Sequence, residues 1–312
     1  MNLKDKKIVV TGGSGFLGSR IVEMLEEKGV TDIVIPRSSS YDLRIAENCA
    51  MITKNADIVF HAAGNVGGIG YNKEHPGSVF YDNIVMDTLM MEESRKNNVE
   101  KFIAIGTVCS YPKFAQVPFS EEQIWNGYPE ETNASYGLAK KMLIVQSEAY
   151  RMQYDFKSIV LIQTNLYGPR DNFNPKTSHV IPALIKKIYD AKLHKYSEIE
   201  LWGDGSPSRD FLYVDDAAQA VILAAEKYDK NEPINIGSGK EITIKELVTL
   251  IMKLTNIDLK IMWNTQKPNG QPRRCLSIKK ARKELGFVPS INIEEGLRRT
   301  IEWYETEQRK QV

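Results

Sequence analysis

Three glycines spaced three residues apart, Gly12, Gly15 and Gly18, constrain the fold of this chain more than any other feature. They follow a short apolar run at residues 7–10 and precede an amphipathic segment at 19–28. Glycines at this spacing between a strand and a helix allow a tight turn, close approach of the backbone to a pyrophosphate, and close packing of the helix on the strand. We therefore predict a dinucleotide-binding strand–turn–helix unit. The cofactor contacts expected in this loop come from Gly12, Gly15, Phe16 and Leu17.

Strand-like and helix-like segments continue to alternate through the first half of the chain. Further strands are expected at 32–35, 58–60, 101–105 and 158–162, and helices at 45–54, 79–97 and 136–154. Such alternation is typical of a parallel sheet covered by helices on both faces. The predicted fold class is therefore α/β, a Rossmann-type doubly wound parallel sheet.

After residue 165 the pattern loosens into a stretch at 166–178 that is rich in Pro, Asn, Asp and Gly, which we interpret as a ligand-binding loop. The remaining helices are expected at 181–192, 214–228, 242–254, 278–285 and 293–308, and the remaining strands at 199–202, 234–236 and 260–262. Asp215 and Asp216 are candidate caps for one of these helices, and Thr243 for another. We predict an NADP(H)-binding domain at 1–165, to which about 212–236 return, and a smaller, mainly substrate-binding lobe at 166–312.

The charge balance argues against several function classes. Lys and Arg total 41 against 40 Asp and Glu, for a net charge of +1, so neither a nucleic-acid surface nor an acidic tail is expected. No apolar run approaches the length of a membrane span, and the first residues show no signal peptide. Cys49, Cys109 and Cys275 are odd in number and lack metal-site spacing. We expect a reduced, cytoplasmic protein without a metal site.

The segment after the second predicted strand bears on the choice of cofactor. Dinucleotide folds bind the ribose 2′-hydroxyl of NAD with an acidic residue there, whereas an arginine accommodates the 2′-phosphate of NADP. Residues 36–40 hold Arg37 and three serines but no carboxylate. NADP(H) is therefore favoured, NAD(H) is possible, and the alternative is a solvated loop without a role.

Tyr136 and Lys140 are four residues apart at the start of a helical segment, so they lie on one helix face. An ammonium held there is expected to lower the pKa of the phenol by favouring the phenolate. A tyrosine tuned in this way exchanges a proton with a sugar hydroxyl or carbonyl. Taken alone, the pair is equally compatible with a packed aromatic ring and a solvated lysine.

Together these motifs resemble the extended short-chain dehydrogenase/reductase family, also described as NAD-dependent epimerases and dehydratases. The resemblance rests on residues 11–18, His61-Ala62-Ala63-Gly64, Asn83, the set Thr107, Tyr136 and Lys140, and the stretch 209–216. It implies that Tyr136 is the catalytic acid/base and that Lys140 bonds the nicotinamide ribose. It also implies that Thr107 bonds the reacting oxygen of the substrate and that Ala62 and Ala63 border the cofactor.

Within that family, residues 65–69, 106–112, 164–184 and 203–209 resemble the GDP-L-fucose synthases, which are 3,5-epimerase–4-reductases. Epimerising two carbons beside a ketone requires proton exchange on both faces of the ring. A thiol and an imidazole suit that task near neutral pH. The resemblance implies Cys109 as the base and His179 as the acid. Taken singly, Cys109 is equally compatible with a small core residue, and His179 with a capping or core residue.

The same resemblance extends to the ligands and to assembly. It implies a nucleotide-sugar substrate, with a GDP-sugar favoured, that contacts Asn165, Lys187, Trp202 and Arg209. Asn165 and His179 would also border the cofactor. Lys187 stands where members of the family commonly have an arginine that binds the substrate. A lysine keeps the positive charge but cannot form the two parallel hydrogen bonds of a guanidinium. A homodimer is expected through the helices at 79–97 and 136–154.

Two other functions stay open at this point. One is a related enzyme on another nucleotide sugar, either a heptose or colitose-type epimerase-reductase or a 4-epimerase that retains NAD. The other is a non-catalytic protein that senses the redox state of a dinucleotide. Intact Thr107, Tyr136 and Lys140 argue against the non-catalytic reading.

Overall fold

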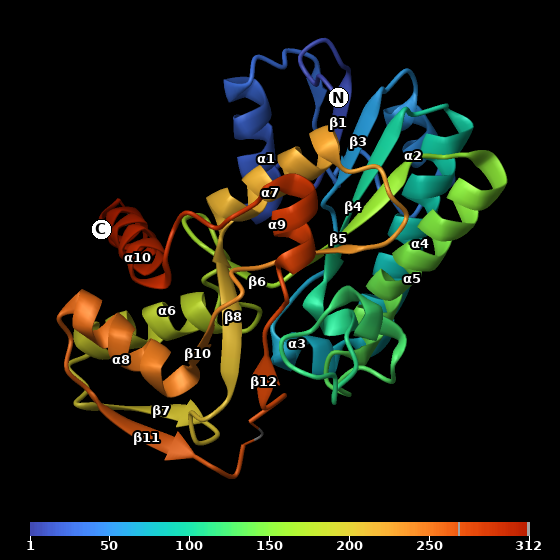
Figure 1. Ribbon diagram of the computed structural model, residues 1–312. Coiled ribbons are helices and arrows are strands. Elements are labelled where there is room, and N and C mark those ends of the chain that lie inside the picture. Colours follow the sequence, from blue (N-terminus) through green and yellow to red (C-terminus); the bar gives the residue numbers. More distant parts are fainter. Residues whose placement is uncertain (268, 311–312) are drawn as a thin grey trace.

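The computed structural model describes residues 1–267 and 269–310 and is built around a six-stranded parallel sheet (Figure 1). Its strands are β1 (Ile8–Thr11), β2 (Ile33–Val34), β3 (Ile58–His61), β4 (Lys101–Thr107), β5 (Ser158–Gln163) and β9 (Ile234–Ile236). They lie in the order β2-β1-β3-β4-β5-β9, so the winding direction reverses between β1 and β3. This is a doubly wound sheet, and the predicted fold class is confirmed.

Helices cover both faces of this sheet. One face carries α1 (Phe16–Glu27), α7 (Val214–Lys227) and α9 (Lys279–Leu285), and the other carries α2 (Ala46–Thr53), α4 (Pro76–Lys96) and α5 (Ala134–Tyr154). Successive strand side chains alternate between the two cores; Ile58 and Phe60 face the first and Val59 faces the second. Because both faces are covered, the strands consist of nearly continuous apolar runs.

A second group of elements lies beyond the carboxyl ends of the strands (Figure 1). Its helices are α6 (Val180–Leu193), α8 (Ile244–Thr255) and α10 (Ile293–Arg309), which share a third core with the parallel pair β7 (Glu198–Trp202) and β11 (Lys260–Asn264). A small sheet joins the two groups and consists of β10 (Glu241–Thr243), β8 (Ser208–Tyr213) and β12 (Arg273–Arg274), with β6 (Asn165–Tyr167) paired to β8. Among the described residues, no helix is long and apolar enough to cross a membrane.

Seven elements were not predicted: the four strands of the small sheet (β6, β8, β10 and β12), the helix α3 (Ile69–Glu74), and the 3₁₀ turns η1 (Val108–Ser110) and η2 (Glu121–Trp125). The cap at Thr243 is confirmed, since its hydroxyl accepts from the backbone N–H of Glu246 in a reciprocal capping box. The cap at Asp215 and Asp216 is wrong. β8 runs directly into α7, so both residues lie in the first turn of the helix, and Asp216 accepts hydrogen bonds from the residues that precede α10.

Replacing Gly18 by alanine tests the close packing of α1 on the glycine loop. A β-carbon there would lie 2.0 Å from the carbonyl oxygen of Gly12, which is backbone and cannot rotate away. We expect Gly18→Ala to lower the free energy of unfolding by about 1–3 kcal/mol or more, measured by urea denaturation. Gly77→Ala is the matched control, because its β-carbon meets open space in the first turn of α4. Equal stability of the two variants would contradict this packing.

Candidate active site

A cavity of about 1200 Å³ lies at the carboxyl ends of the parallel strands, the usual ligand position in doubly wound sheets. It continues toward the second group of elements, where α6, β7 and β8 border it. Single small-molecule sites occupy roughly 300–1000 Å³, so this cavity is large enough for two ligands. The predicted site residues that line it are Gly12, Gly15, Phe16, Leu17, Ala62, Ala63, Thr107, Cys109, Tyr136, Lys140, Asn165, His179, Lys187, Trp202 and Arg209.

The start of α1 fits an anion such as a pyrophosphate. Its N-cap is Gly15, no side chain caps the helix, and the first turn holds no acidic residue. The first amide groups of a helix have no partner within the helix, and the helix dipole favours negative charge at this end. Because no side chain caps these amide groups, the loop at the cavity is suited to bind the phosphates of a dinucleotide.

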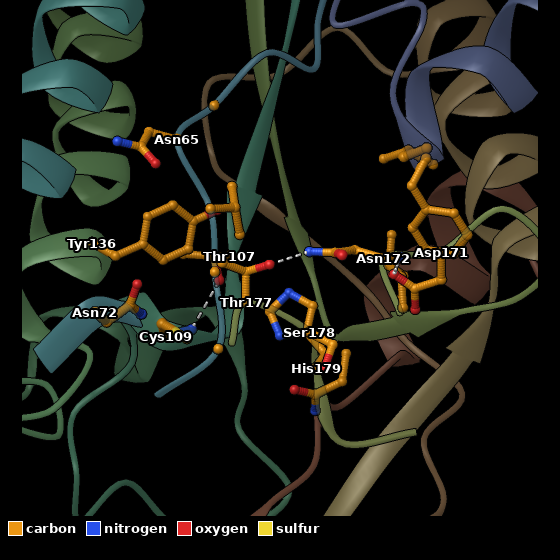
Figure 2. A pocket seen from close by; sticks show the side chains of 18 of the residues that line it. Asn65, Asn72, Thr107, Cys109, Tyr136, Asp171, Asn172, Thr177, Ser178 and His179 are labelled. Atoms are coloured by element: carbon orange, nitrogen blue, oxygen red, sulfur yellow. Dashed lines mark hydrogen bonds between the residues drawn. The ribbon is translucent and has the colours of Figure 1, made fainter. Parts of the chain in front are cut away.

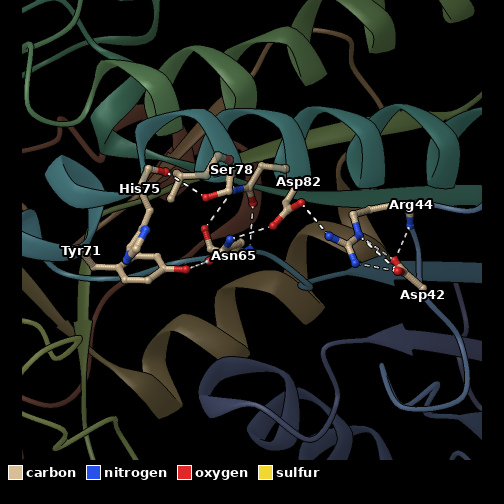
Figure 3. Close-up of polar contacts among 9 residues, drawn as sticks. Asp42, Arg44, Asn65, Tyr71, His75, Ser78 and Asp82 are labelled. Carbon is tan, nitrogen blue, oxygen red and sulfur yellow. Dashed lines mark hydrogen bonds and ion pairs between the residues drawn. The ribbon is translucent and has the colours of Figure 1, made fainter.

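The loop after β2 is arranged differently from the expectation. Arg37 is exposed and does not line the cavity, although Pro36 and Ser38 on either side of it do. Arg44, which was not predicted, borders the cavity there, with its Nε 2.9 Å from Asp42 and its Nη1 2.9 Å from Asp82 (Figure 3). Hydrogen bonds from Arg44 lower the pKa of Asp42 to about 2. The charge of Arg44 is thus balanced by the carboxylates of Asp42 and Asp82, and only the fold brings Asp82 to this place.

Thr107, Tyr136 and Lys140 line the cavity where α5 packs against the end of β4. Figure 2 shows Thr107 and Tyr136 side by side. Tyr136 lies in the first turn of α5, and Lys140 follows one turn later with its side chain buried. The Lys140 ammonium donates to Asp87 Oδ1 at 2.8 Å and to the Ala63 carbonyl at 3.4 Å. The Thr107 hydroxyl accepts from the backbone N–H of Cys109 at 3.2 Å.

The expected lowering of the pKa of Tyr136 is wrong for this structure. Burial raises the pKa of the phenol above its ordinary value, Cys109 and Asp87 act in the same direction, and Thr107 opposes them. The main physical reason is that the buried phenolate would lose its hydration, and the carboxylate of Asp87, which pairs with Lys140, adds to this effect.

Cys109 differs from the other two cysteines. Cys49 and Cys275 are core residues, and burial raises the pKa of each thiol to about 12. Cys109 lies on η1 at the cavity wall and is only partly buried. The guanidinium of Arg274, on β12, lies 3.5 Å from its sulfur. The site thus places a cation beside the one cysteine sulfur that lines the cavity, within the described residues.

Arg274 was not predicted as a site residue. It is buried, and its Nε and Nη2 donate to the side-chain oxygen of Gln271 at 3.2 and 2.9 Å. The segment 268–274 resembles a family segment near the substrate, but the place of Arg274 beside Cys109 depends on a two-residue strand that pairs with β8.

His179 occupies the N-cap position of α6, but its side chain makes no capping hydrogen bond. His179 lines the cavity and retains accessible surface there, and the burial of its imidazole among the surrounding residues lowers the pKa of the ring. Figure 2 shows it on the other side of the cavity from Cys109 and Tyr136. The structure therefore brings a thiol and an imidazole to one cavity from two directions.

The remaining predicted residues lie toward the far end of the cavity. Burial, with Arg274 nearby, lowers the pKa of Arg209 to about 10, and its Nη1 donates to the Ser208 and Gln271 carbonyls. Lys187 and Trp202 are exposed there. Asn165, nearer the sheet, donates to the carbonyl of Asp210 at 2.9 Å.

Four further cavity residues carry buried polar atoms that have no hydrogen-bond partner: Oδ1 of Asn72, both side-chain polar atoms of Gln163, Oδ2 of Asp171 and Oγ of Ser178. Burial raises the pKa of Asp171 to about 7. Buried polar groups are almost always satisfied in folded proteins. Unpaired atoms at this cavity suit a polar ligand, and none of the four residues was predicted as a site residue.

Comparisons with known proteins agree with this arrangement. The model of the NAD dependent epimerase/dehydratase family matches residues 8–237. A putative GDP-L-fucose synthase 2 of Arabidopsis thaliana is 38% identical over 303 residues, which are 96% of this chain and 92% of the relative. The expected resemblance is thereby confirmed.

Two solved structures are similar throughout. A GDP-6-OMe-4-keto-L-xylo-heptose reductase from C. jejuni superposes with a TM-score of 0.91 at 27% identity, covering 97% of this chain and 99% of the other. A GDP-L-fucose synthetase from Naegleria fowleri bound to NADP superposes with a TM-score of 0.87 at 26% identity, covering 98% and 96%. On these grounds the chain belongs to the NAD dependent epimerase/dehydratase family.

Proposed function

We propose that this chain is an NADP(H)-dependent 3,5-epimerase and 4-reductase of a GDP-linked 4-keto-6-deoxyhexose, which forms GDP-L-fucose or a near relative. The observation that carries the proposal is the single cavity in which Thr107, Tyr136 and Lys140 share one wall with Cys109 while His179 comes from the other side. The printed names of the relatives support a GDP-sugar as substrate.

The reduction requires a hydride donor and a proton donor on one ketone. NADPH, when bound, supplies the hydride to carbon 4. Tyr136 donates its phenolic proton to the ketone oxygen, so the C=O bond becomes a C–H and an O–H bond. Thr107 holds the same oxygen by a hydrogen bond. Lys140 binds the nicotinamide ribose and keeps the tyrosine in place.

The epimerisation uses the opposite walls of the cavity. Cys109 removes a proton from the carbon beside the ketone, which leaves an enolate. Thr107 and Tyr136 stabilise the enolate oxygen by hydrogen bonds. His179 then returns a proton from the other face, so the configuration inverts. Arg274, whose guanidinium lies 3.5 Å from the cysteine sulfur, positions that sulfur.

The dinucleotide and the sugar nucleotide bind in different parts of the cavity. Residues 1–165, with about 212–236, hold the dinucleotide through Gly12, Gly15, Phe16, Leu17, Ala62 and Ala63. Residues 166–312 hold the sugar nucleotide through Asn165 at the border and Lys187, Trp202 and Arg209. Arg37 at the rim is proposed to approach the 2′-phosphate, which favours NADP(H) over NAD(H).

The direct test is NADPH oxidation with GDP-4-keto-6-deoxymannose, with the sugar product identified. The proposal expects oxidation and GDP-L-fucose. Oxidation that forms the unepimerised sugar would assign a plain 4-reductase. Turnover of a GDP-linked keto-heptose alone would indicate a substrate like that named for the C. jejuni reductase. A tightly bound NAD that survives dialysis would contradict the proposal and indicate a 4-epimerase.

The protein is also proposed to be a cytoplasmic homodimer. Its three cysteines are all free thiols, which suits a reducing compartment. α4 and α5 lie side by side on the outer face of the sheet (Figure 1). They expose large apolar side chains, namely Phe80, Tyr81, Val145, Met152 and Tyr154. An apolar surface of this kind on two adjacent helices suits a partner's matching surface.

Light scattering at micromolar concentration tests the dimer. We expect the mass of two chains for the native protein and a shift toward one chain for Val145→Glu, because a charge buried in an apolar interface is costly. Glu148→Gln, on the same helix, is a control that introduces no new charge. A native mass of one chain would contradict the proposal.

Replacing Tyr136 by phenylalanine tests the proton donor. The variant keeps the ring and loses only the hydroxyl, so we expect the rate of ketone reduction to fall by about 100- to 10,000-fold. NADPH affinity, measured by fluorescence titration, should stay within a few-fold of the native value. Normal turnover in the Tyr136→Phe variant would show that Tyr136 is not the proton donor.

Cys109→Ser separates the two reactions. We expect the variant to lose epimerisation while it still reduces a ketone that is already epimerised, because the hydride and proton donors are untouched. Cys275→Ser is the control for a buried thiol outside the cavity. Equal losses in both half-reactions of Cys109→Ser would indicate that Cys109 only packs the wall.

A further inference from the structure

A chain of buried polar contacts lies behind Lys140. Its ammonium is 2.8 Å from Oδ1 of Asp87, on α4, and the two side chains are each 3% exposed. The same oxygen of Asp87 is 2.9 Å from Nε2 of His61, and Nδ1 of His61 is 2.7 Å from the hydroxyl of Thr11. His61 and Thr11 are fully buried. The proposed function uses none of Thr11, His61 and Asp87.

The hydrogen bonds fix where the protons lie in this chain. The carboxylate of Asp87 can only accept, so Nε2 of His61 carries the ring proton and donates to it. Nδ1 of the neutral ring then accepts from the Thr11 hydroxyl, which itself accepts from the backbone N–H of Ala63. Burial lowers the pKa of His61, so the ring is neutral. The charged pair is therefore Asp87 and Lys140 alone.

This pairing determines what Lys140 does to its neighbour Tyr136. An isolated ammonium one helical turn away would favour the phenolate, whereas an ammonium paired with a carboxylate is nearly neutral at that distance. The other groups that face Tyr136 are Thr107 and Cys109 at the end of β4 and His179 across the cavity. Cys109 as a thiolate would also favour the protonated phenol, because both charges are negative.

We propose that Asp87, held by His61 and Thr11, is a positioning residue that balances the charge of Lys140 and keeps Tyr136 as a proton donor, which sets this site to reduce ketones rather than to oxidise alcohols. Reduction needs the phenolic proton to pass to the ketone oxygen as hydride reaches the carbon. Oxidation needs a phenolate to accept the proton of the alcohol. The directional part rests on the proposed role of Tyr136, whereas the effect of Asp87 on its protonation does not.

An NMR titration of protein carrying ¹³Cζ-labelled tyrosine tests the proposal without sugar or cofactor. Tyr136→Phe identifies the Tyr136 signal by its absence. In the native protein we expect this signal to stay at the phenol position up to the alkaline limit of folding. In Asp87→Asn, which keeps the shape and removes the charge, we expect ionisation roughly 1–3 pH units lower than in the native protein.

Two further variants secure the result. Asp87→Asn/Lys140→Met removes both charges, so its Tyr136 signal should behave like the native one. Asp87→Ser, whose smaller side chain leaves space for water beside Lys140, replaces the asparagine variant if that variant does not fold. An Asp87 variant that folds and titrates like the native protein would overturn the proposal.

The pH profile of ketone reduction provides the readout for direction. In Asp87→Asn we expect activity to decline at a lower pH than in the native protein, because the phenolate has no proton to donate. The titration distinguishes the two possible failures. If the signal shifts but no ketone is reduced, the substrate proposal fails and the role of Asp87 stands. If ketones are reduced but the signal does not shift, the role of Asp87 fails.

Discussion

The contact on which the site depends is the close approach of α5 to the turn that follows β4. Gly137 lies between Tyr136 and Lys140, and a β-carbon there would come within 2.2 Å of the Cys109 carbonyl oxygen. The absence of a side chain allows the helix and the turn to meet backbone to backbone, and Ser110 donates to the Gly137 carbonyl at 2.9 Å. One contact thus holds the proposed proton donor for reduction beside the proposed base for epimerisation.

The electrostatic surroundings of those two groups differ in sign. Near Tyr136 the charge of Lys140 is balanced by Asp87, and burial raises the pKa of the phenol. Near Cys109 the guanidinium of Arg274 supplies a positive charge, and Arg209 stands close by. Placing two titratable groups in different electrostatic surroundings is a recurrent way to obtain an acid and a base in one site. The proposed sequence needs this division: a thiolate to remove a proton and a phenol to donate one.

The sequence predicted the features that depend on local spacing. The glycine loop, the alternation of strands and helices, and the helical face shared by Tyr136 and Lys140 are all encoded within a few residues, and the fold follows from them. Asp87, Arg274 and Arg44 were missed because each reaches the site through contacts with residues far along the chain, as with Asp87, which is 53 residues from Lys140. The predicted pKa shift of Tyr136 was wrong because the burial of the phenol, together with the nearby Asp87, depends on the fold. Asp171 was missed because its burial in a Pro- and Asn-rich loop cannot be read from composition.

The measurement that tests the central claim most directly is the reaction in heavy water, with the sugar product examined by mass spectrometry and NMR. The claim is that one cavity carries out proton exchange on both faces of the ring and then reduction. It predicts deuterium at carbons 3 and 5 and none at carbon 4, where the hydrogen comes from NADPH. A reduced product without deuterium at carbons 3 and 5 would contradict it, because Cys109 and His179 would then face the cavity without exchanging protons with the substrate.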